Sequence, residues 1–256
     1  MTSRIALITG GSRGLGRASA LALADDGTDV VLTYLHGREQ ADEVVAELAA
    51  RGRRAVALPL DTRADRTFAA FADELRRVLV ETWGRDQLDV LVHNAGTFAP
   101  TPFGATEPGT LDDLFALHVR GPMLLTDHLA PLVADGGHVL TVSSGLTRFF
   151  VDPVYAGYAA MKGAVEVWTR YLAVVLGARG IAVNTIAPGA TATDFGGGAV
   201  RDTPAYQERI AATSAMGRVG QPDDIGRAVA AIVSGRMGWV TGQRIEASGG
   251  QAMGHA

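Results

Sequence analysis

The chain has 256 residues, and its 47% hydrophobic and 20% charged residues are ordinary values for one globular α/β domain spanning 1–256. A formal net charge of −4 without a basic block argues against nucleic-acid binding, and no apolar run approaches the roughly 18 residues of a membrane span. The absence of cysteine excludes disulfides and cysteine-based metal sites, and we expect no metal. We expect a cytoplasmic protein, because the chain starts on a strand without a signal-peptide layout.

Short β-rich runs alternate with helix-length segments along the chain. Most of the runs are apolar throughout, as strands covered on both faces should be. This alternation predicts a doubly wound α/β fold, with seven parallel strands and helices on both faces. The predicted strands are 4–9, 29–34, 55–60, 88–93, 138–143, 181–186 and 243–247.

The first strand leads into a glycine-rich turn, "TGGSRGLG" at 9–16, and then into a helix. Such a turn lets the backbone approach a pyrophosphate, and the helix offers free N–H groups. The pattern G-x-G-x-x-G fits poorly, because its last glycine would fall on Ser19, and the lysine-containing phosphate loop is absent. The turn predicts a dinucleotide site of another pattern.

Charge near the second strand favours NADP(H) over NAD(H). A ribose bound through its diol needs an acidic residue where that strand ends, but the residues there are Tyr34, Leu35 and His36. Arg13 lies in the glycine turn and Arg38 follows the strand, so cations surround the expected 2′ position. The alternatives are a solvated loop arginine at 13 and a helix-start residue at 38.

Lys162 is the only lysine among 23 lysine and arginine residues, which suggests a position where a guanidinium would not serve, although codon bias is an alternative. On a helix it neighbours Tyr158 at i−4, whereas Tyr155 has no such partner. A cation beside a phenol lowers the phenol pKa, so Tyr158 is the candidate acid/base. Tyr155 is either a pocket wall or a packed aromatic residue.

The least regular stretch is 188–204, which contains three consecutive glycines. It is too long and too glycine-rich for a routine connection. We interpret it as a mobile flap near a site, the alternative being a disordered surface loop.

Nearly the whole chain resembles the short-chain dehydrogenase/reductase family, and in particular its 3-oxoacyl-[acyl-carrier-protein] reductase-like members. The glycine turn is similar to the family's T-G-x-x-x-G-x-G, and "YAAMK" (158–162) to its Y-x-x-x-K. The other matching segments are "HNAG" (93–96), "VSSG" (142–145), "NTIAPGATATD" (184–194), "GQPDDIGRAV" (220–229) and "VTGQRIEASGG" (240–250).

The resemblance implies a Rossmann-type fold and a catalytic Ser144, Tyr158 and Lys162. Tyr158 would exchange the proton with the carbonyl oxygen, Lys162 would lower the pKa of Tyr158 and bind the nicotinamide ribose, and Ser144 would hold the carbonyl oxygen. Ser143 is the alternative serine. The implied cofactor-binding residues, with those argued above, are Gly10, Ser12, Arg13, Gly14, Leu15, Gly16, Tyr34, Arg38, Asp61, Asn94, Ala95, Gly96, Tyr158, Lys162, Pro188, Gly189, Thr191 and Thr193.

The chain departs from the family pattern at a few positions. His118 stands where the family usually has an asparagine thought to hold a relay water; an imidazole titrating near neutrality could serve, or it could be a structural histidine. His93 and Ser248 replace a usual asparagine and aspartate. Val174 stands where carrier-protein reductases commonly have a basic residue, although Arg170 and Arg120 could replace it.

We therefore expect an NADP(H)-dependent enzyme that interconverts a carbonyl and a secondary alcohol by hydride transfer. The leading specific version is a 3-oxoacyl-thioester reductase; rivals are a ketoreductase of secondary metabolism and a small-ketone or sugar reductase. From another class, the alternative is a non-catalytic NADP(H)-binding regulator. The resemblance also implies a homo-oligomer, a tetramer or a dimer, paired through helices around 110–134 and 157–179.

Overall fold

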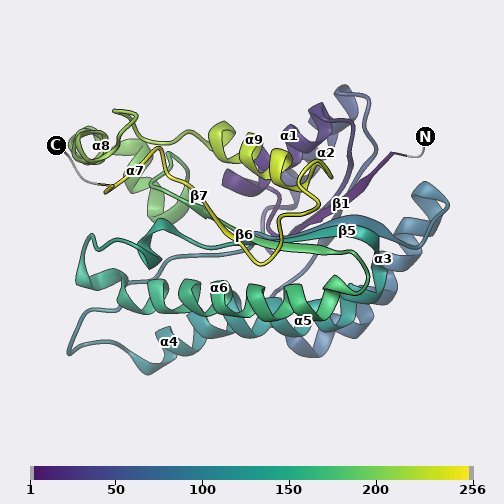
Figure 1. The fold of residues 1–256 in the computed structure, drawn as a ribbon, viewed down its shortest axis with the longest axis horizontal. Coiled ribbons are helices and arrows are strands. Elements are labelled where there is room, and N and C mark those ends of the chain that lie inside the picture. Colours follow the sequence, from purple (N-terminus) through teal and green to yellow (C-terminus); the bar gives the residue numbers. More distant parts are fainter. Residues whose placement is uncertain (1–2, 254–256) are drawn as a thin grey trace.

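A computed structural model describes residues 3–253 and contains a seven-stranded sheet in the order β3-β2-β1-β4-β5-β6-β7 (Figure 1). All the strand pairs are parallel. The strands are β1 (Ile5–Ile8), β2 (Asp29–Tyr34), β3 (Ala55–Pro59), β4 (Leu88–His93), β5 (Val133–Val142), β6 (Ala182–Pro188) and β7 (Arg244–Ala247). The seven strands and the doubly wound fold expected from the sequence are confirmed.

Helices cover both faces of the sheet. Figure 1 shows α1, α2 and α9 above it and α3, α4, α5 and α6 below it. Their bounds are α1 (Gly14–Asp25), α2 (Arg38–Ala50), α3 (Phe68–Trp83), α4 (Pro108–Phe115), α5 (Gly121–Leu129), α6 (Ala156–Gly177) and α9 (Pro222–Val233). The short helices α7 (Ala199–Asp202) and α8 (Pro204–Thr213) lie near β7 at one end of the molecule (Figure 1).

Two hydrophobic cores form because strand side chains alternate between the faces. In β1, Ile5 and Leu7 belong to the core under α3, α5 and α6, whereas Ala6 and Ile8 belong to the core under α1, α2 and α9. All four side chains are fully buried. A strand buried on both faces must be apolar at every position, which explains why the strands were recognisable in the sequence.

The stretch 188–204 is more ordered than a plain loop. A 3₁₀ turn at Phe195–Gly198 and the short helix α7 follow β6, and Gly196, Gly197 and Gly198 all have positive φ angles. Glycine adopts positive φ angles without the steric penalty that a Cβ brings, so three successive residues in this conformation explain the triple glycine.

The sheet has its switch in strand order between β1 and β4, which lie side by side although β2 and β3 separate them in the chain. In such sheets a ligand site forms at the carboxyl ends of the strands beside the switch. The glycine turn after β1 and the segment after β4 both lie there. Within residues 3–253, no helix is long and apolar enough to cross a membrane.

Candidate active site

The turn after β1 is a tightly built cradle that requires glycine. A Cβ at Gly16 would lie 2.2 Å from the carbonyl oxygen of Gly10 and 2.5 Å from Nδ2 of Asn94. That amide donates hydrogen bonds of 2.9 Å to the carbonyls of Thr9 and Gly10, so the end of β4 holds the turn in shape. The start of α1 has no side-chain cap and no acidic residue in its first turn, which leaves its N–H groups free to bind phosphate.

The surroundings of the second strand fit a 2′-phosphate. Arg13 is exposed at the start of α1, and Arg38 is exposed at the start of α2, where its guanidinium lies 3.6 Å from Asp42. Tyr34 ends β2 and is partly buried, with exposed Leu35 and His36 after it. The one acidic residue of β2, Asp29, is buried at the opposite end of the strand, where Arg54 and Trp83 donate hydrogen bonds to it. Both arginines are therefore exposed, and their contact with a 2′-phosphate stays a prediction.

Asp61, one of the predicted cofactor-binding residues, follows β3 and pairs with the neighbouring Arg63. Its carboxylate accepts hydrogen bonds from the backbone N–H and Nε of Arg63 at 2.9 and 3.0 Å. Burial raises the pKa of Asp61, but the hydrogen bonds from Arg63 outweigh burial and leave the pKa below its usual value. Asp61 is thus an ionised acceptor after β3, and its contact with a cofactor stays a prediction.

Ser144, Tyr158 and Lys162 come together at the carboxyl end of β5. Tyr158 and Lys162 lie one turn apart on α6 and are 7% and 5% exposed. The ammonium nitrogen of Lys162 donates to the carbonyl oxygen of Val142 at 2.8 Å and lies 5.7 Å from the centre of the Tyr158 ring. Ser144 is the serine whose side chain acts on Tyr158, lowering its pKa, whereas the Ser143 hydroxyl donates to Glu166 at 2.6 Å. Of the two serines, Ser144 is therefore the one that faces the tyrosine.

The protein alone does not lower the pKa of Tyr158, contrary to the sequence expectation. Burial raises the pKa of Tyr158 above its ordinary value, and the hydrogen bond from Ser144 offsets this only in part. Burial also lowers the pKa of Lys162 to about 7. Desolvation disfavours the charged form of both groups. Its effect on the two pKa values is larger than that of the attraction between ammonium and phenolate, which the helical spacing had suggested.

His118 lies beside this group, in a π-helical turn at Ala116–Arg120, a kind of irregularity that is frequent at functional sites. Its ring packs edge-on against Tyr158 with centroids 5.4 Å apart, and Nε2 lies 2.8 Å from the carbonyl oxygen of Thr97. Because a carbonyl only accepts, Nε2 has the proton and Nδ1 is the acceptor. Among the described residues, Nδ1 has no hydrogen-bond partner although it is buried.

The expectation that His118 titrates near neutrality is wrong. Burial, followed by the charge of Lys162, lowers the pKa of His118 to about 2, while the hydrogen bond to Thr97 opposes this shift. The imidazole therefore stays neutral at every working pH. His93, the other unusual histidine, is a buried structural residue whose Nε2 lies 2.8 Å from Oγ1 of Thr126.

The segment after β6 reaches back to the glycine turn. A Cβ at Gly14 would lie 3.8 Å from Cβ of Thr193, which is buried. Thr191 bonds the carbonyl of Gly189 and forms an isolated bridge with Gly220, which fixes the loop. Pro188 to Thr193 are thus placed between the glycine turn and the Ser144 turn, as a nicotinamide-binding segment would be.

Aromatic rings around Tyr158 were missed by the sequence analysis. Phe98 has its centroid 4.8 Å from that of Tyr155 and 6.1 Å from that of Tyr158, and Phe195 lies 5.8 Å from Tyr158. The Tyr155 hydroxyl lies 3.4 Å from that of Tyr206 in α8. These rings come from four separate segments without a shared spacing, so no sequence signal predicted the cluster. Tyr155 is packed against another ring in this aromatic wall, and its role as a wall of a substrate pocket stays a prediction.

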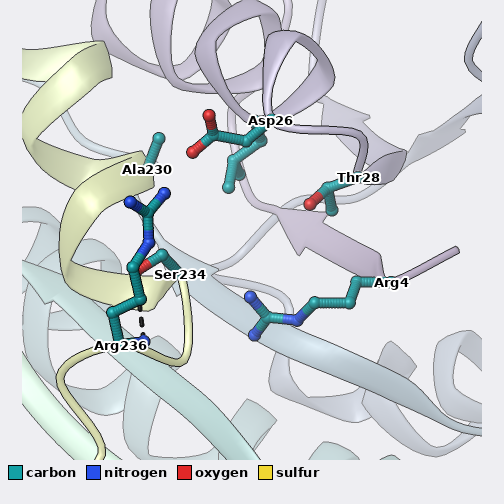
Figure 2. A pocket seen from close by; sticks show the side chains of 7 residues that line it. Arg4, Asp26, Thr28, Ala230, Ser234 and Arg236 are labelled. Carbon is teal, nitrogen blue, oxygen red and sulfur yellow. Dashed lines mark hydrogen bonds between the residues drawn. The ribbon is translucent and has the colours of Figure 1, made fainter.

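A separate cavity of about 120 Å³ lies at the opposite ends of the strands, beside the amino ends of β1 and β2. Figure 2 shows Arg4, Asp26, Thr28, Ser234 and Arg236 around it, where β1 begins and α9 ends. Arg4 is held there by a 2.6 Å hydrogen bond to the carbonyl of Val233. The amino ends of parallel strands are not where such sheets bind ligands, so this cavity does not belong to the catalytic group.

Comparison with known proteins supports one family. Residues 10–252 match the family described as enoyl-(acyl carrier protein) reductase. The chain is 35% identical to the hydroxynaphthalene reductase-like protein Arp2 of Metarhizium robertsii, covering 98% of this chain and 95% of that one.

Two solved ketoreductases share the whole fold. The promiscuous reductase LugOII, which catalyses keto-reduction at C1 in lugdunomycin biosynthesis, has a TM-score of 0.92 and 37% identity, covering 99% of both chains. The angucycline C-6 ketoreductase LanV with bound NADP has a TM-score of 0.92 and 34% identity, covering 99% of this chain and 97% of that one.

Proposed function

This chain belongs to the short-chain dehydrogenase/reductase family, and we propose that it reduces a ring ketone of an aromatic substrate, using Ser144, Tyr158 and Lys162. At the level of the reaction it is an NADP(H)-dependent oxidoreductase that interconverts a carbonyl and an alcohol. The single observation that supports the residue roles is the gathering of these three side chains at the carboxyl end of β5.

The residues present fit the dinucleotide. The cradle at Gly10 and Gly16 leaves room for backbone approach alone, the free end of α1 suits a diphosphate, and Arg13 suits a 2′-phosphate. Asn94 to Gly96 and Pro188 to Thr193 would hold the adenosine and nicotinamide parts. When bound, NADPH supplies the hydride for the carbonyl carbon.

The chain's own residues manage the oxygen and its proton. The Ser144 hydroxyl, which accepts from the N–H of Leu146 at 3.2 Å, would turn its proton from Tyr158 to the carbonyl oxygen of a bound substrate. Tyr158, protonated because burial raises its pKa, donates its proton as negative charge develops there. The ammonium of Lys162 stabilises the phenolate that results, and preorganised donors of this kind act strongly in a dry site.

His118 takes part as a neutral acceptor in this proposal. Its Nε2 proton is committed to Thr97, and the buried Nδ1 has a lone pair available to a hydroxyl or water beside Tyr158. It would orient that proton donor, and its own charge would not change.

The substrate class follows from the aromatic rings. Phe98, Tyr155 and Phe195 surround Tyr158, and flat aromatic surfaces stack well on such rings. The Arp2 relatives are named for hydroxynaphthalene, a fused-ring molecule, LanV is named as an angucycline ketoreductase, and one LanV structure holds rabelomycin. A carrier-bound thioester is less well supported, because an exposed valine stands at position 174 and Arg120 already pairs with Asp65, which leaves the exposed Arg170 as the remaining expected docking residue.

We further propose a homo-oligomer, a tetramer or a dimer, in the cytoplasm. The apolar side chains of Tyr171, Val174 and Val175 are 70% to 81% exposed on α6, and an exposed apolar strip suits a second copy. The cytoplasm is proposed because the reaction uses NADP(H), a cofactor of cell interiors.

A panel assay tests this function. We expect the purified protein to oxidise NADPH with fused-ring aromatic ketones, and Tyr158→Phe to bind NADPH normally while losing about 10²- to 10⁴-fold in turnover. Binding of NADPH without turnover on any ketone would instead favour the non-catalytic regulator.

A further inference from the structure

A carboxylate on α6 gathers three donors behind the candidate catalytic serine. Glu166 lies one turn beyond Lys162 and two turns beyond Tyr158, so all three share one face of the helix. Its Oε1 accepts from the hydroxyls of Ser143 and Thr147 at 2.6 and 2.7 Å, and from Nε of Arg244 at 2.8 Å.

Arg244, the first residue of β7, completes the connection. Besides Glu166, it donates to the carbonyl oxygen of Ser144 at 3.3 Å and to Glu246 at 2.9 Å. Glu246 in turn accepts two 2.6 Å hydrogen bonds from Arg148, which also donates to the carbonyl of Gln251. The turn 143–148 is therefore bound at its start, centre and end by charged groups from α6 and the last strand.

These contacts can set the geometry of the reaction. The side chains of Arg244 and Glu166 are 22% and 14% exposed, so their charge-assisted hydrogen bonds are partly protected from water. They hold the Ser144 turn through its backbone and its neighbours, whereas the Ser144 hydroxyl remains free to face Tyr158. A shift of about 1 Å in a positioning group can reduce turnover about 100-fold.

We propose that Glu166 and Arg244 are positioning residues that fix the Ser144 hydroxyl for the carbonyl oxygen. The proposal rests on the proposed ketone reduction at this site. Neither residue is assigned a contact with substrate or cofactor; both act through Ser144. The last strand is then a functional support of the active site as well as a sheet edge.

A double-mutant cycle on Glu166 and Ser144 tests the pair. We expect Glu166→Gln to lower kcat about 10- to 100-fold on a ketone while the Kd for NADPH, measured by fluorescence, changes less than about threefold. In the Ser144→Ala background, Glu166→Gln should cost almost nothing more. Equal losses in both backgrounds, or a loss confined to NADPH binding, would overturn the proposal.

Two further variants separate positioning from folding. Arg244→Lys should retain part of the activity that Arg244→Met loses, because an ammonium keeps the charge but not the planar fork. Asp89→Asn is the matched control, because the ion pair of Asp89 with Arg85 is similarly buried but lies near the amino end of β4. The kcat of this variant should be unchanged. If Asp89→Asn and Glu166→Gln lower kcat alike, the effect is general stability and the proposal fails.

The controls also keep this proposal apart from the proposed function. A wild-type protein that binds NADPH but reduces no ketone contradicts the proposed function itself. If the wild type reduces ketones and Glu166→Gln does so equally well, only the positioning role of Glu166 and Arg244 is contradicted.

Discussion

The ammonium of Lys162 lies 5.7 Å from the ring centre of Tyr158, and both side chains are almost completely buried. This arrangement gives a physical reason for a lysine at position 162. A compact cation fits between the end of β5 and the phenol, where it donates to Val142. A planar guanidinium would need room for several donors there.

Burial of Lys162 predicts an unusual pH dependence. Its pKa is lowered to about 7, so the cation is present below pH 7 and is lost as the pH rises. Because kcat/KM for NADPH reports the free enzyme, it should fall about tenfold per pH unit well above that value. Lys162→Met should have a low kcat/KM for NADPH that does not fall further above pH 7. A wild-type kcat/KM that stays constant from pH 6 to 9 would contradict the prediction.

Cofactor preference should depend on Arg13 more than on Arg38. The Arg38 guanidinium already lies 3.6 Å from Asp42, whereas no ion pair involving Arg13 is found in residues 3–253. Arg13→Ala should lower kcat/KM for NADPH about 10- to 100-fold, with little change for NADH. Arg38→Ala serves as the comparison and should have a smaller effect. Parallel losses with both cofactors would show that Arg13 does not contact a 2′-phosphate.

The aromatic wall should discriminate among substrates. Phe98→Ala removes a ring that packs on Tyr155, and each lost aromatic contact costs about 0.5–1.5 kcal/mol. We therefore expect KM for a fused-ring ketone to rise about 3- to 10-fold, with a smaller rise for a small aliphatic ketone. Phe103→Ala, at a fully exposed phenylalanine, is the control. Equal effects of Phe98→Ala on both ketones would argue against the proposed substrate class.

Buried neutral histidines should destabilise the protein in mild acid. Burial lowers the pKa of His93 to about 4, and burial with Lys162 lowers that of His118 to about 2. Below an unfolded pKa of about 6.5 the unfolded chain binds protons that the folded chain does not, so stability falls with pH. At pH 5 each residue should cost about 2 kcal/mol. Urea unfolding should show that the free energy of unfolding falls less between pH 7 and pH 5 in His93→Asn than in the wild type. An equal fall in both proteins would contradict this prediction.

The exposed strip on α6 should control assembly. Val174→Glu places a charge in the middle of the apolar residues 171–175, and a buried unpaired charge is costly. Light scattering after size exclusion should show a smaller mass for this variant than for the wild type. Val80→Glu, at a half-exposed valine of α3, should leave the mass unchanged. A wild-type monomer would disprove the proposed oligomer.

The sequence by itself determined the sheet and the pairing of Tyr158 with Lys162. Both depend on local periodicity: strands covered on two faces are apolar at each position, and residues four apart share a helix face. The glycine turn was equally visible, because close backbone approach restricts the residue type at each position.

Only the tertiary structure decided which serine faces Tyr158, how burial shifts the pKa values of Tyr158 and Lys162, and which nitrogen of His118 is free. It also joined Glu166 to Arg244, residues 78 positions apart, behind the Ser144 turn. Desolvation and hydrogen bonds between distant segments depend on how the layers pack, and no local pattern encodes them.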